Sequence, residues 1–259
     1  MTNNEIQRIA MEQSAIDLNC SPDDFLSCNN VIVKSSANIK GRKYLELPFD
    51  CNLVSYGNNI VASVSGKTER IVRNYIEHYS LEHCFETPNI HILNEGLKGL
   101  GLGVCFMAEY FLPDIGSLKL LSCLYKIKVM NPVDFANLYL PEWSNALCEK
   151  RRELDVLAVG AFDGDKLVGM AGCSADCEIM WQIGVDVLPE YRRKGIAAAL
   201  TSRIAAETLE LGKVPFYCAA WSNLKSVNNA LKCGFKPTWV ELTAKKLQFI
   251  DEINKIKGS

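Results

Sequence analysis

The sequence has no long apolar run and no excess of one charge. Its 259 residues include 28 basic and 30 acidic side chains, a formal net charge of -2, and its pI is near 6.0. A nucleic-acid backbone or an anionic membrane is held by a basic surface, which this balance does not indicate. No run approaches the roughly 18 apolar residues needed to span a bilayer, and residues 1–8 lack the order of a signal peptide. We therefore expect a cytoplasmic protein that binds neither nucleic acid nor membrane.

Histidine is scarce, with three residues, whereas cysteine is common, with eleven. An odd number of cysteines at scattered spacing in a long chain does not fit a disulfide scaffold. The pair closest to metal-ligand spacing is Cys173 with Cys177, and the last histidine, His91, lies far before it. We expect reduced, mostly buried thiols and no metal site.

The length predicts two domains. For residues 1–115 we expect an amino-terminal α/β domain of unknown role. Its signals are a helical spacing up to Asn19, a short helix capped by Ser21, strands at 31–34 and 45–49, a hairpin around Gly57 and a helix ending near His78. The glycine-rich stretch 96–103 predicts a flexible turn, and 113–117 a linker. None of these residues indicates a chemistry.

Residues 124–259 predict a second α/β domain with sharper signals. Asp163-Gly164 supplies the left-handed residues of a two-residue hairpin loop. Asn131-Pro132 predicts a helix that carries Phe135, Leu138 and Leu147. The remaining elements expected are strands at 125–130, 179–187, 216–220 and 238–242 and helices at 196–211 and 224–233.

The segment from Val185 to Ala197 joins a strand to an amphipathic helix through a basic loop. Backbone N–H groups at such a helix start are unpaired and meet the positive end of the helix dipole, so they attract an anion. Gly195 permits close approach of the backbone to a ligand, and Ala197 keeps the first turn narrow. The loop therefore predicts an anion site. Its candidate residues are Arg192, Arg193, Lys194, Gly195, Ile196 and Ala197.

Pro189 closes the preceding strand, since proline cannot donate to a ladder. A strand edge that opens there accepts an extended chain, and pantetheine carries two amides that pair with backbone groups at Val185 and Val187. A pyrophosphate at the helix and pantetheine along the strand together indicate coenzyme A.

These residues carry a family resemblance. Arg192 to Ala197 resembles the acyl-CoA signature of the GNAT superfamily, which is Arg or Gln, two residues, Gly, one residue, and Gly or Ala; Val187 to Tyr191 resembles its lead-in. The later stretch from Asn223 through Ser226 to Gly234-Phe235 is similar to the family's second CoA-contacting helix and its closing Gly-Phe. Both motifs stand in the family's order, separated by one helix and one strand.

The resemblance covers about residues 124–245 and implies a GNAT fold, with a central mixed, mostly antiparallel twisted sheet flanked by helices. It implies acetyl-CoA as co-substrate, no metal, and cofactor contacts at Asn223 and Ser226. The alternative to a cofactor contact is a purely structural role, in which Ser222 or Asn223 is the N-cap of the helix that follows. Gly234 and Phe235 are expected to be structural, as a left-handed helix stop and its hydrophobic contact.

The implied activity is transfer of an acetyl group to a primary amine of a small molecule or peptide, by direct attack in a ternary complex. Many relatives have a tyrosine acid seven residues after the asparagine, but Ala230 stands there. For a base we expect Glu178 or Asp186, eight residues apart and on one face of a regular strand, with exposed surface carboxylates as the alternative. The N–H of Val187 is the candidate donor to the thioester oxygen. Tyr217 and Trp221 are expected at the acceptor, unless they belong to the core.

Two readings of function remain open. One is an active N-acetyltransferase whose amino-terminal domain helps to shape the acceptor site. The other is a CoA-binding regulatory or interaction protein of GNAT fold with weak or no catalysis, which Ala230 favours. A further alternative is that the amino-terminal half is a degenerate copy of the same fold, because a hairpin there is followed by a helix at Thr68. The two halves share no repeated motif. The acceptor and the oligomeric state, a homodimer included, stay open.

Overall fold

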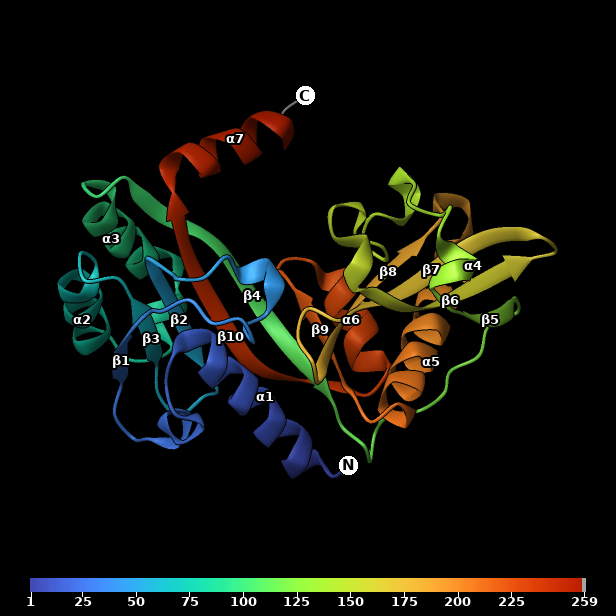
Figure 1. The fold of residues 1–259 in the computed structure, drawn as a ribbon, viewed down its shortest axis with the longest axis horizontal. Helices are drawn as coiled ribbons and strands as arrows, with labels where there is room; N and C mark the ends of the chain where they lie inside the picture. Colours follow the sequence, from blue (N-terminus) through green and yellow to red (C-terminus); the bar gives the residue numbers. More distant parts are fainter. Residues whose placement is uncertain (258–259) are drawn as a thin grey trace. The chain divides into compact units, whose positions relative to one another are not determined.

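The computed structural model describes residues 1–257 (Figure 1), and its internal contacts divide the chain into two compact units. Unit 1 comprises residues 1–10 and 110–237, and unit 2 comprises residues 11–109 and those from 238 onward. The expected domains, 1–115 and 124–259, stay a prediction, because these contacts divide the chain differently at both ends. Three elements have residues in both units: α1 (Asn3–Leu18), β4 (Leu102–Pro113) and β10 (Phe235–Lys246).

Unit 2 contains a sheet with the strand order β1-β3-β2-β10. The first pair is parallel and the other two are antiparallel. Its remaining elements are β1 (Val31–Lys34), β2 (Cys51–Ser55), β3 (Val61–Val64), α2 (Glu69–His78), α3 (Thr87–Lys98), α7 (Leu247–Lys257) and the 3-10 turns η1 (Pro22–Leu26), η2 (Lys43–Leu45) and η3 (His83–Phe85).

The two faces of this sheet differ in polarity. Leu53, Ala62 and Leu242 belong to an apolar cluster with residues of α2 and α3. Because side chains alternate along a strand, Ser63 and Thr243 lie on the opposite face, where Ser63 Oγ donates to the carbonyl of Leu18 in α1 at 2.8 Å. The sheet is therefore buried on both sides, apolar toward α2 and α3 and polar toward α1.

Unit 1 is a mixed, mostly antiparallel sheet with the order β9-β8-β7-β6-β5, and only the β8–β9 pair is parallel. The predicted α/β class and this type of sheet are confirmed. Its elements are β5 (Lys126–Met130), α4 (Pro132–Phe135), η4 (Pro141–Trp143), η5 (Glu149–Leu154), β6 (Asp155–Asp163), β7 (Lys166–Ser174), β8 (Met180–Val187), η6 (Pro189–Tyr191), α5 (Ile196–Glu210), β9 (Val214–Ala219) and α6 (Leu224–Lys232).

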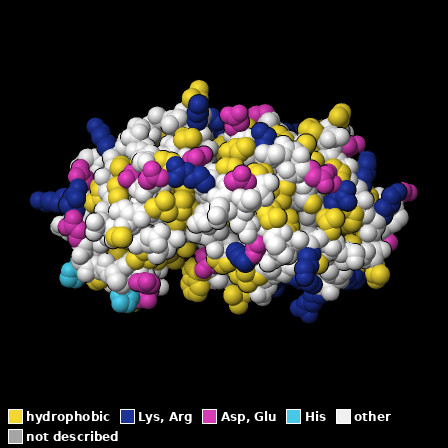
Figure 2. All heavy atoms as spheres, turned by 90° about the horizontal axis from the view of Figure 1, so that it is seen from below, with side chains coloured by type: hydrophobic (Ala, Val, Ile, Leu, Met, Phe, Trp, Pro, Cys, Tyr) yellow, Lys and Arg dark blue, Asp and Glu magenta, His cyan; other side chains and the backbone are white. Residues whose placement is uncertain are grey.

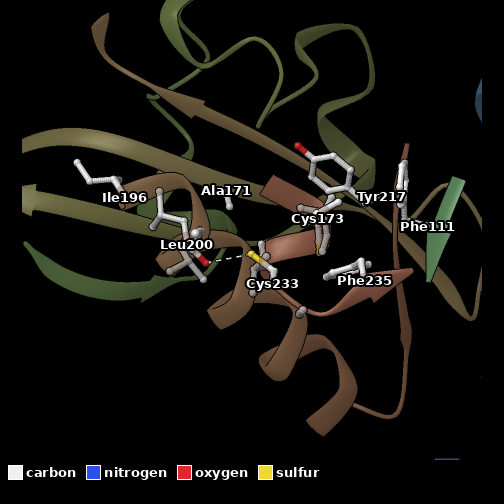
Figure 3. Packing of buried hydrophobic residues seen from close by; sticks show 14 of the residues in the cluster. Phe111, Ala171, Cys173, Ile196, Leu200, Tyr217, Cys233 and Phe235 are labelled. Carbon is white, nitrogen blue, oxygen red and sulfur yellow. Dashed lines mark hydrogen bonds between the residues drawn. The ribbon is translucent and has the colours of Figure 1, made fainter. Parts of the chain in front are cut away.

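Helices cover both faces of the unit 1 sheet. On one face, Ile196, Leu200 and Ile204 of α5 pack into a cluster with β6, β7, β9 and the end of α6 (Figure 3). On the other face, Phe135, Trp143 and neighbouring residues of the segment between β5 and β6 form a second cluster. Gly234 ends α6 with φ of 89° and Phe235 is buried, as expected for a structural pair.

Three local predictions were wrong. The strand expected at 45–49 does not form, because Leu45 ends a 3-10 turn and Glu46 has a left-handed φ of 55°, which an extended strand excludes. The helix begun at Pro132 ends at Phe135 instead of reaching Leu147. A helix could not have run through to Leu147 in any case, because Leu140, the residue before Pro141, is driven to an extended conformation. The expected linker at 113–117 is a hydrogen-bonded turn inside unit 1, where Asp114 accepts from Asn3 and pairs with Lys236.

All eleven cysteines lie within residues 1–257 and none of them forms a disulfide; five are buried, among them Cys173 and Cys177. Among residues 1–257, no group of three or more His, Cys, Asp or Glu side chains is placed to hold a metal ion. Within the same range, no helix combines the length and apolarity that crossing a bilayer requires. On the face shown in Figure 2, basic and acidic side chains are interspersed, so this face offers no continuous surface of one sign.

Candidate functional site

Strands β8 and β9 run side by side for only part of their length. They pair in parallel over Met180–Gln182 and Val214–Phe216, and β8 then continues to Val187 and β9 to Ala219. A cavity of about 530 Å³ lies within unit 1 at the divergent end. It is lined by Asn145, Val185, Asp186, Val187, Tyr191, Arg192, Arg193, Gly195, Ile196, Ala197, Ala198, Tyr217, Asn223, Lys225, Ser226, Asn228, Asn229 and Lys232.

The edge of β8 that faces away from β7 is available beyond Gln182. The N–H of Leu188 donates to the carbonyl of Val168 at 3.0 Å, so the backbone of residue 188 is directed at β7. Backbone groups alternate in an antiparallel pair, and Val185 and Val187 therefore direct their N–H and C=O groups to the opposite edge. This is the orientation that the predicted pantetheine contact requires. Both residues line the cavity.

The loop between β8 and α5 brings helix N–H groups to the mouth of the cavity. Pro189 begins a 3-10 turn, Arg193 has φ of 62°, and Gly195 is the N-cap of α5 with φ of 79°. Glycine has no side chain to cap the helix, so the first N–H groups of α5 are left for another acceptor. The left-handed conformation explains the glycine at 195, because a Cβ there would meet only Ser122 O, at 3.9 Å. The loop therefore has the backbone conformation on which the predicted anion site depends, and the site itself stays a prediction.

The basic side chains of the loop are not equivalent. Arg192 and Arg193 line the cavity, and Arg192 Nε also donates to the Val187 carbonyl at 3.1 Å. Lys194 is predicted to bind the cofactor but is not a lining residue. Its Nζ lies 4.8 Å from the Tyr191 ring centroid and donates to the Tyr125 hydroxyl at 3.3 Å, so a cation–π contact holds it at the outer side of the loop.

Helix α6 forms the opposite wall of the cavity. Asn223 is its N-cap and accepts from the N–H of Ser226 at 3.3 Å, so the capping role is present in the structure, while both side chains also line the cavity. Sequence reasoning missed the polar face of this helix, which is Lys225, Asn228, Asn229 and Lys232. Their spacing of three, four and seven residues places them on one helix face, and a helical projection from Lys225 would have found them.

The lining residues give the cavity a positive character. Arg192, Arg193, Lys225 and Lys232 line it, whereas Asp186 is the acidic lining residue. Exposed basic side chains attract phosphate oxygens and form charge-assisted hydrogen bonds with them. The charge and the helix N-terminus favour the same ligand, a phosphorylated molecule with an extended arm.

Asp186 lines the cavity, but its carboxylate already accepts three hydrogen bonds. Oδ2 accepts from the backbone N–H groups of Asn145 and Ala146, at 2.8 and 2.9 Å, and Oδ1 accepts from the Asn145 side chain at 2.6 Å. Glu178 is exposed, precedes β8 in a bend and does not line the cavity. The structure therefore does not bring the two predicted bases together, and Asp186 holds the 145–146 loop.

Replacement of Asp186 by alanine is expected to lower the free energy of unfolding by about 1 kcal/mol, because it leaves the part-buried N–H of Ala146 without an acceptor and removes two exposed hydrogen bonds from Asn145. Urea denaturation followed by circular dichroism measures the change. Glu178→Ala is the matched control, an exposed carboxylate whose loss should stay within about 0.5 kcal/mol. Equal stability of the two variants would show that Asp186 does not hold the loop.

The two aromatic residues predicted at the acceptor have different positions. Tyr217 is 3% exposed, lines the cavity and shares a hydrogen bond of 2.9 Å between its hydroxyl and Ser226 Oγ. Burial raises the pKa of Tyr217 above its ordinary value, although its hydrogen bond with Ser226 opposes the shift. Trp221 is 60% exposed and is not a lining residue.

Comparison with known families identifies the segment that builds this cavity. Residues 124–235 match the acetyltransferase (GNAT) family, and no family model matches the amino-terminal half. The resemblance seen in the two motifs is thereby confirmed, and residues 124–235 form a GNAT acetyltransferase domain. No curated protein matches the chain.

Solved structures with similar folds are distant in sequence. An acetyltransferase-like protein of the GNAT family from Novosphingobium aromaticivorans has 19% sequence identity to this chain and a TM-score of 0.45. The match covers 56% of this chain and 66% of the other protein. A GCN5-related N-acetyltransferase-like protein from Streptococcus suis is 20% identical, with a TM-score of 0.44, over 59% and 69%. The aminoglycoside N-acetyltransferase AAC(6')-Iy, in complex with CoA, is 18% identical, with a TM-score of 0.36, over 47% and 93%. Similarities at this level assign no activity.

Proposed function

We propose that the GNAT domain is an N-acetyltransferase that binds acetyl-CoA in the cavity between β8 and β9 and transfers the acetyl group to a primary amine. The observation that carries the proposal is the pairing of β8 with β9, which ends at Gln182 and leaves an open strand edge beside the uncapped start of α5. An edge that accepts amides and a helix start that accepts phosphates match the two chemical halves of coenzyme A.

The cofactor is expected to lie along the cavity in one direction. Its pyrophosphate lies at the backbone of residues 193–197, where Arg192 and Arg193 add charge. The pantetheine arm then follows β8, with its amides at Val187 and Val185. This direction carries the thioester toward the narrow end of the cavity, where β8 and β9 begin to pair.

The proposed chemistry is direct attack of the amine on the thioester in a ternary complex. An alkylamine has a pKa near 10.4, so it must lose a proton before it attacks. Asp186 is committed to the 145–146 loop and Glu178 lies outside the cavity, which favours a water chain leading to a base. The acceptor class is a small-molecule or peptide amine.

Isothermal titration of the full chain with acetyl-CoA tests the cofactor assignment, and matched glycine variants test its location. Gly195→Ala is expected to weaken binding at least about tenfold, since an L-residue in the left-handed region costs about 1–2 kcal/mol and the new Cβ meets the phosphate. Gly212→Ala places the same strain, at φ of 72°, just beyond the end of α5 and outside the cavity lining, and should retain affinity. Absence of binding by the unmodified chain would overturn the proposal.

A second candidate function is CoA binding without catalysis, as in a regulatory or interaction protein. The hydrogen bonds of Asp186 favour this second function. Asp186 is the acidic residue of the cavity lining, and a carboxylate that accepts three hydrogen bonds from the protein is not available as a general base. A thiol-release assay across amines, amino acids, aminoglycosides and peptides separates the two. Release with any acceptor supports the transferase, and binding with no release across the panel supports the regulator.

A further inference from the structure

Tyr217 lines the cavity next to the paired part of β8 and β9. It follows Phe216, the last residue of β9 paired with β8, so it lies where the two strands separate. Its ring packs 6.3 Å, centroid to centroid, from that of Phe235 in the core. Figure 3 shows the hydroxyl directed away from the other labelled core side chains. The phenol is therefore fixed by packing at one end and reaches polar surroundings at the other.

The proposed reaction needs a proton at this end of the cavity. When the tetrahedral intermediate collapses, the carbon–sulfur bond breaks and the sulfur leaves as a thiolate. Two tyrosines line the cavity, and the hydroxyl of the other one, Tyr191, is bound to Asp163 Oδ2 at 3.0 Å, beside the loop that precedes α5. Of the basic lining residues, Arg192 and Arg193 belong to the loop at the phosphate end, and Lys225 and Lys232 lie on α6. Tyr217 is the phenol at the narrow end, toward which the pantetheine arm leads.

Ser226 gives the phenol a route for proton return. Its Oγ lies 2.9 Å from the Tyr217 hydroxyl, and its side chain is partly exposed in the same cavity. A hydroxyl between the phenol and solvent passes on a proton without a net change in its own charge. The pair therefore forms a short donor chain that ends at the cavity.

From this geometry we infer that Tyr217 is a catalytic residue of the proposed acetyl transfer, the hydrogen-bond and proton donor to the departing CoA thiolate. The amine nitrogen forms the new carbon–nitrogen bond and releases its proton to water. The carbon–sulfur bond breaks, the sulfur takes the phenolic proton, and the phenolate takes one from water through Ser226. The products are the acetamide and CoA, and no oxidant or further reactant is consumed.

The inference rests on the proposed function, and two measurements on Tyr217→Phe test it. The first is turnover at saturating acetyl-CoA, expected to fall about 100-fold, the lower end of the range for general acid catalysis, with the KM for the amine retained. The second is the ultraviolet absorbance of the thiolate of bound CoA as the pH is raised. Loss of a hydrogen bond to the thiolate should raise the pKa of the bound thiol by about one unit.

Tyr75→Phe is the matched control, because Tyr75 is also buried and its hydroxyl donates to the Cys84 carbonyl at 3.0 Å, outside the cavity lining. It should change neither measurement. If Tyr217→Phe keeps turnover within about threefold of the unmodified chain, or loses turnover without moving the pKa of the thiol, the inference is overturned. A raised KM for the amine with turnover retained would assign Tyr217 to the acceptor and overturn it equally. Failure of the unmodified chain to bind CoA is a different result and rejects the proposed function itself.

Discussion

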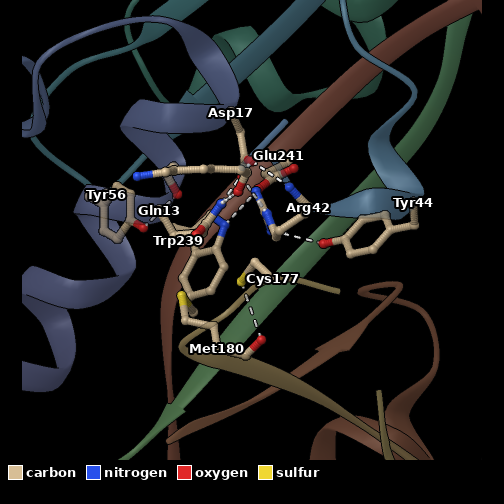
Figure 4. A network of polar contacts seen from close by, with 11 residues as sticks. Gln13, Asp17, Arg42, Tyr44, Tyr56, Cys177, Met180, Trp239 and Glu241 are labelled. Atoms are coloured by element: carbon tan, nitrogen blue, oxygen red, sulfur yellow. Dashed lines mark hydrogen bonds and ion pairs between the residues drawn. The ribbon is translucent and has the colours of Figure 1, made fainter. Parts of the chain in front are cut away.

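Replacement of Arg42 by methionine is expected to destabilise unit 2 by about 3–5 kcal/mol, the range for a buried ion pair that loses one partner. Arg42 is 2% exposed and lies between two buried carboxylates (Figure 4). Its Nε is 2.5 Å from Asp17 Oδ2, and its Nη2 is 2.6 Å from Glu241 Oε1. Methionine fills much of the volume but leaves two desolvated carboxylates facing each other without a cation.

The size of this effect is expected to depend on pH. Burial raises the pKa of Asp17, and the charge of Arg42 lowers it in part. A carboxyl group with a raised pKa holds its proton more tightly in the folded state, so the free energy of unfolding falls as the pH rises from the ordinary carboxyl range toward the raised pKa. Removal of Arg42 raises this pKa further. The difference between variant and unmodified chain should therefore be larger at about pH 7 than at about pH 5.

Urea denaturation at the two pH values measures both effects. Arg73→Met is the control, because Arg73 pairs with Glu69 on an exposed helix face, where solvent screens the pair and its loss should leave the stability nearly unchanged. A triple variant, Asp17→Leu, Arg42→Met and Glu241→Leu, removes all three charges and should recover much of the loss. If Arg42→Met unfolds at the same urea concentration as the unmodified chain at both pH values, the network does not stabilise the unit.

The cofactor loop was predictable because its signals are local. The turn at Pro189, the left-handed Gly195 and the helix that follows depend on residues within a few positions of one another. The same is true of the hairpin at Gly57 and of the N-cap at Ser21, which both form as predicted. Backbone preferences of single residues suffice for such features.

Contacts between distant parts of the chain were not predictable in this way. Arg42 and Glu241 are separated by 199 positions, and neither residue has a sequence pattern that pairs it with the other. Tyr217 was assigned from the sequence to the acceptor or to the core, since no pattern shows that its hydroxyl meets Ser226. Ala230 indicates that the tyrosine acid of many relatives is missing, but it does not indicate a replacement. Tyr217, which we infer to be the donor, is recognised only once the strand that carries it and the helix that carries Ser226 are placed together.

The 145–146 loop is another contact of this kind, and Gly184→Ala is expected to disrupt it. A Cβ at residue 184 would overlap the carbonyl oxygen and carbon of Asn145. Gly184 pairs with Gly172 of β7, where a Cβ would overlap the carbonyl of Ala146 in the same manner. The two glycines thus make a flat patch on which the loop backbone lies, and Asp186, two residues further along β8, holds it there.

The loop has to move away in Gly184→Ala, because backbone atoms cannot be displaced as a side chain can. We expect a loss of about 3 kcal/mol in the free energy of unfolding, at the upper end for an overpacked site. Since Asn145 lines the cavity, the affinity for acetyl-CoA should fall as well. Urea denaturation and isothermal titration of the same preparations measure the two effects.

Gly160→Ala provides the control in the same sheet. A Cβ at residue 160 of β6 would meet the ends of the Leu167, Phe162 and Met130 side chains, which can rotate aside, so a cost of about 1 kcal/mol or less is expected. Equal costs for the two variants would mean that the loop yields as readily as these side chains. In that case the close backbone contact at Gly184 does not fix the wall of the cavity, and Asn145 is positioned by Asp186 alone.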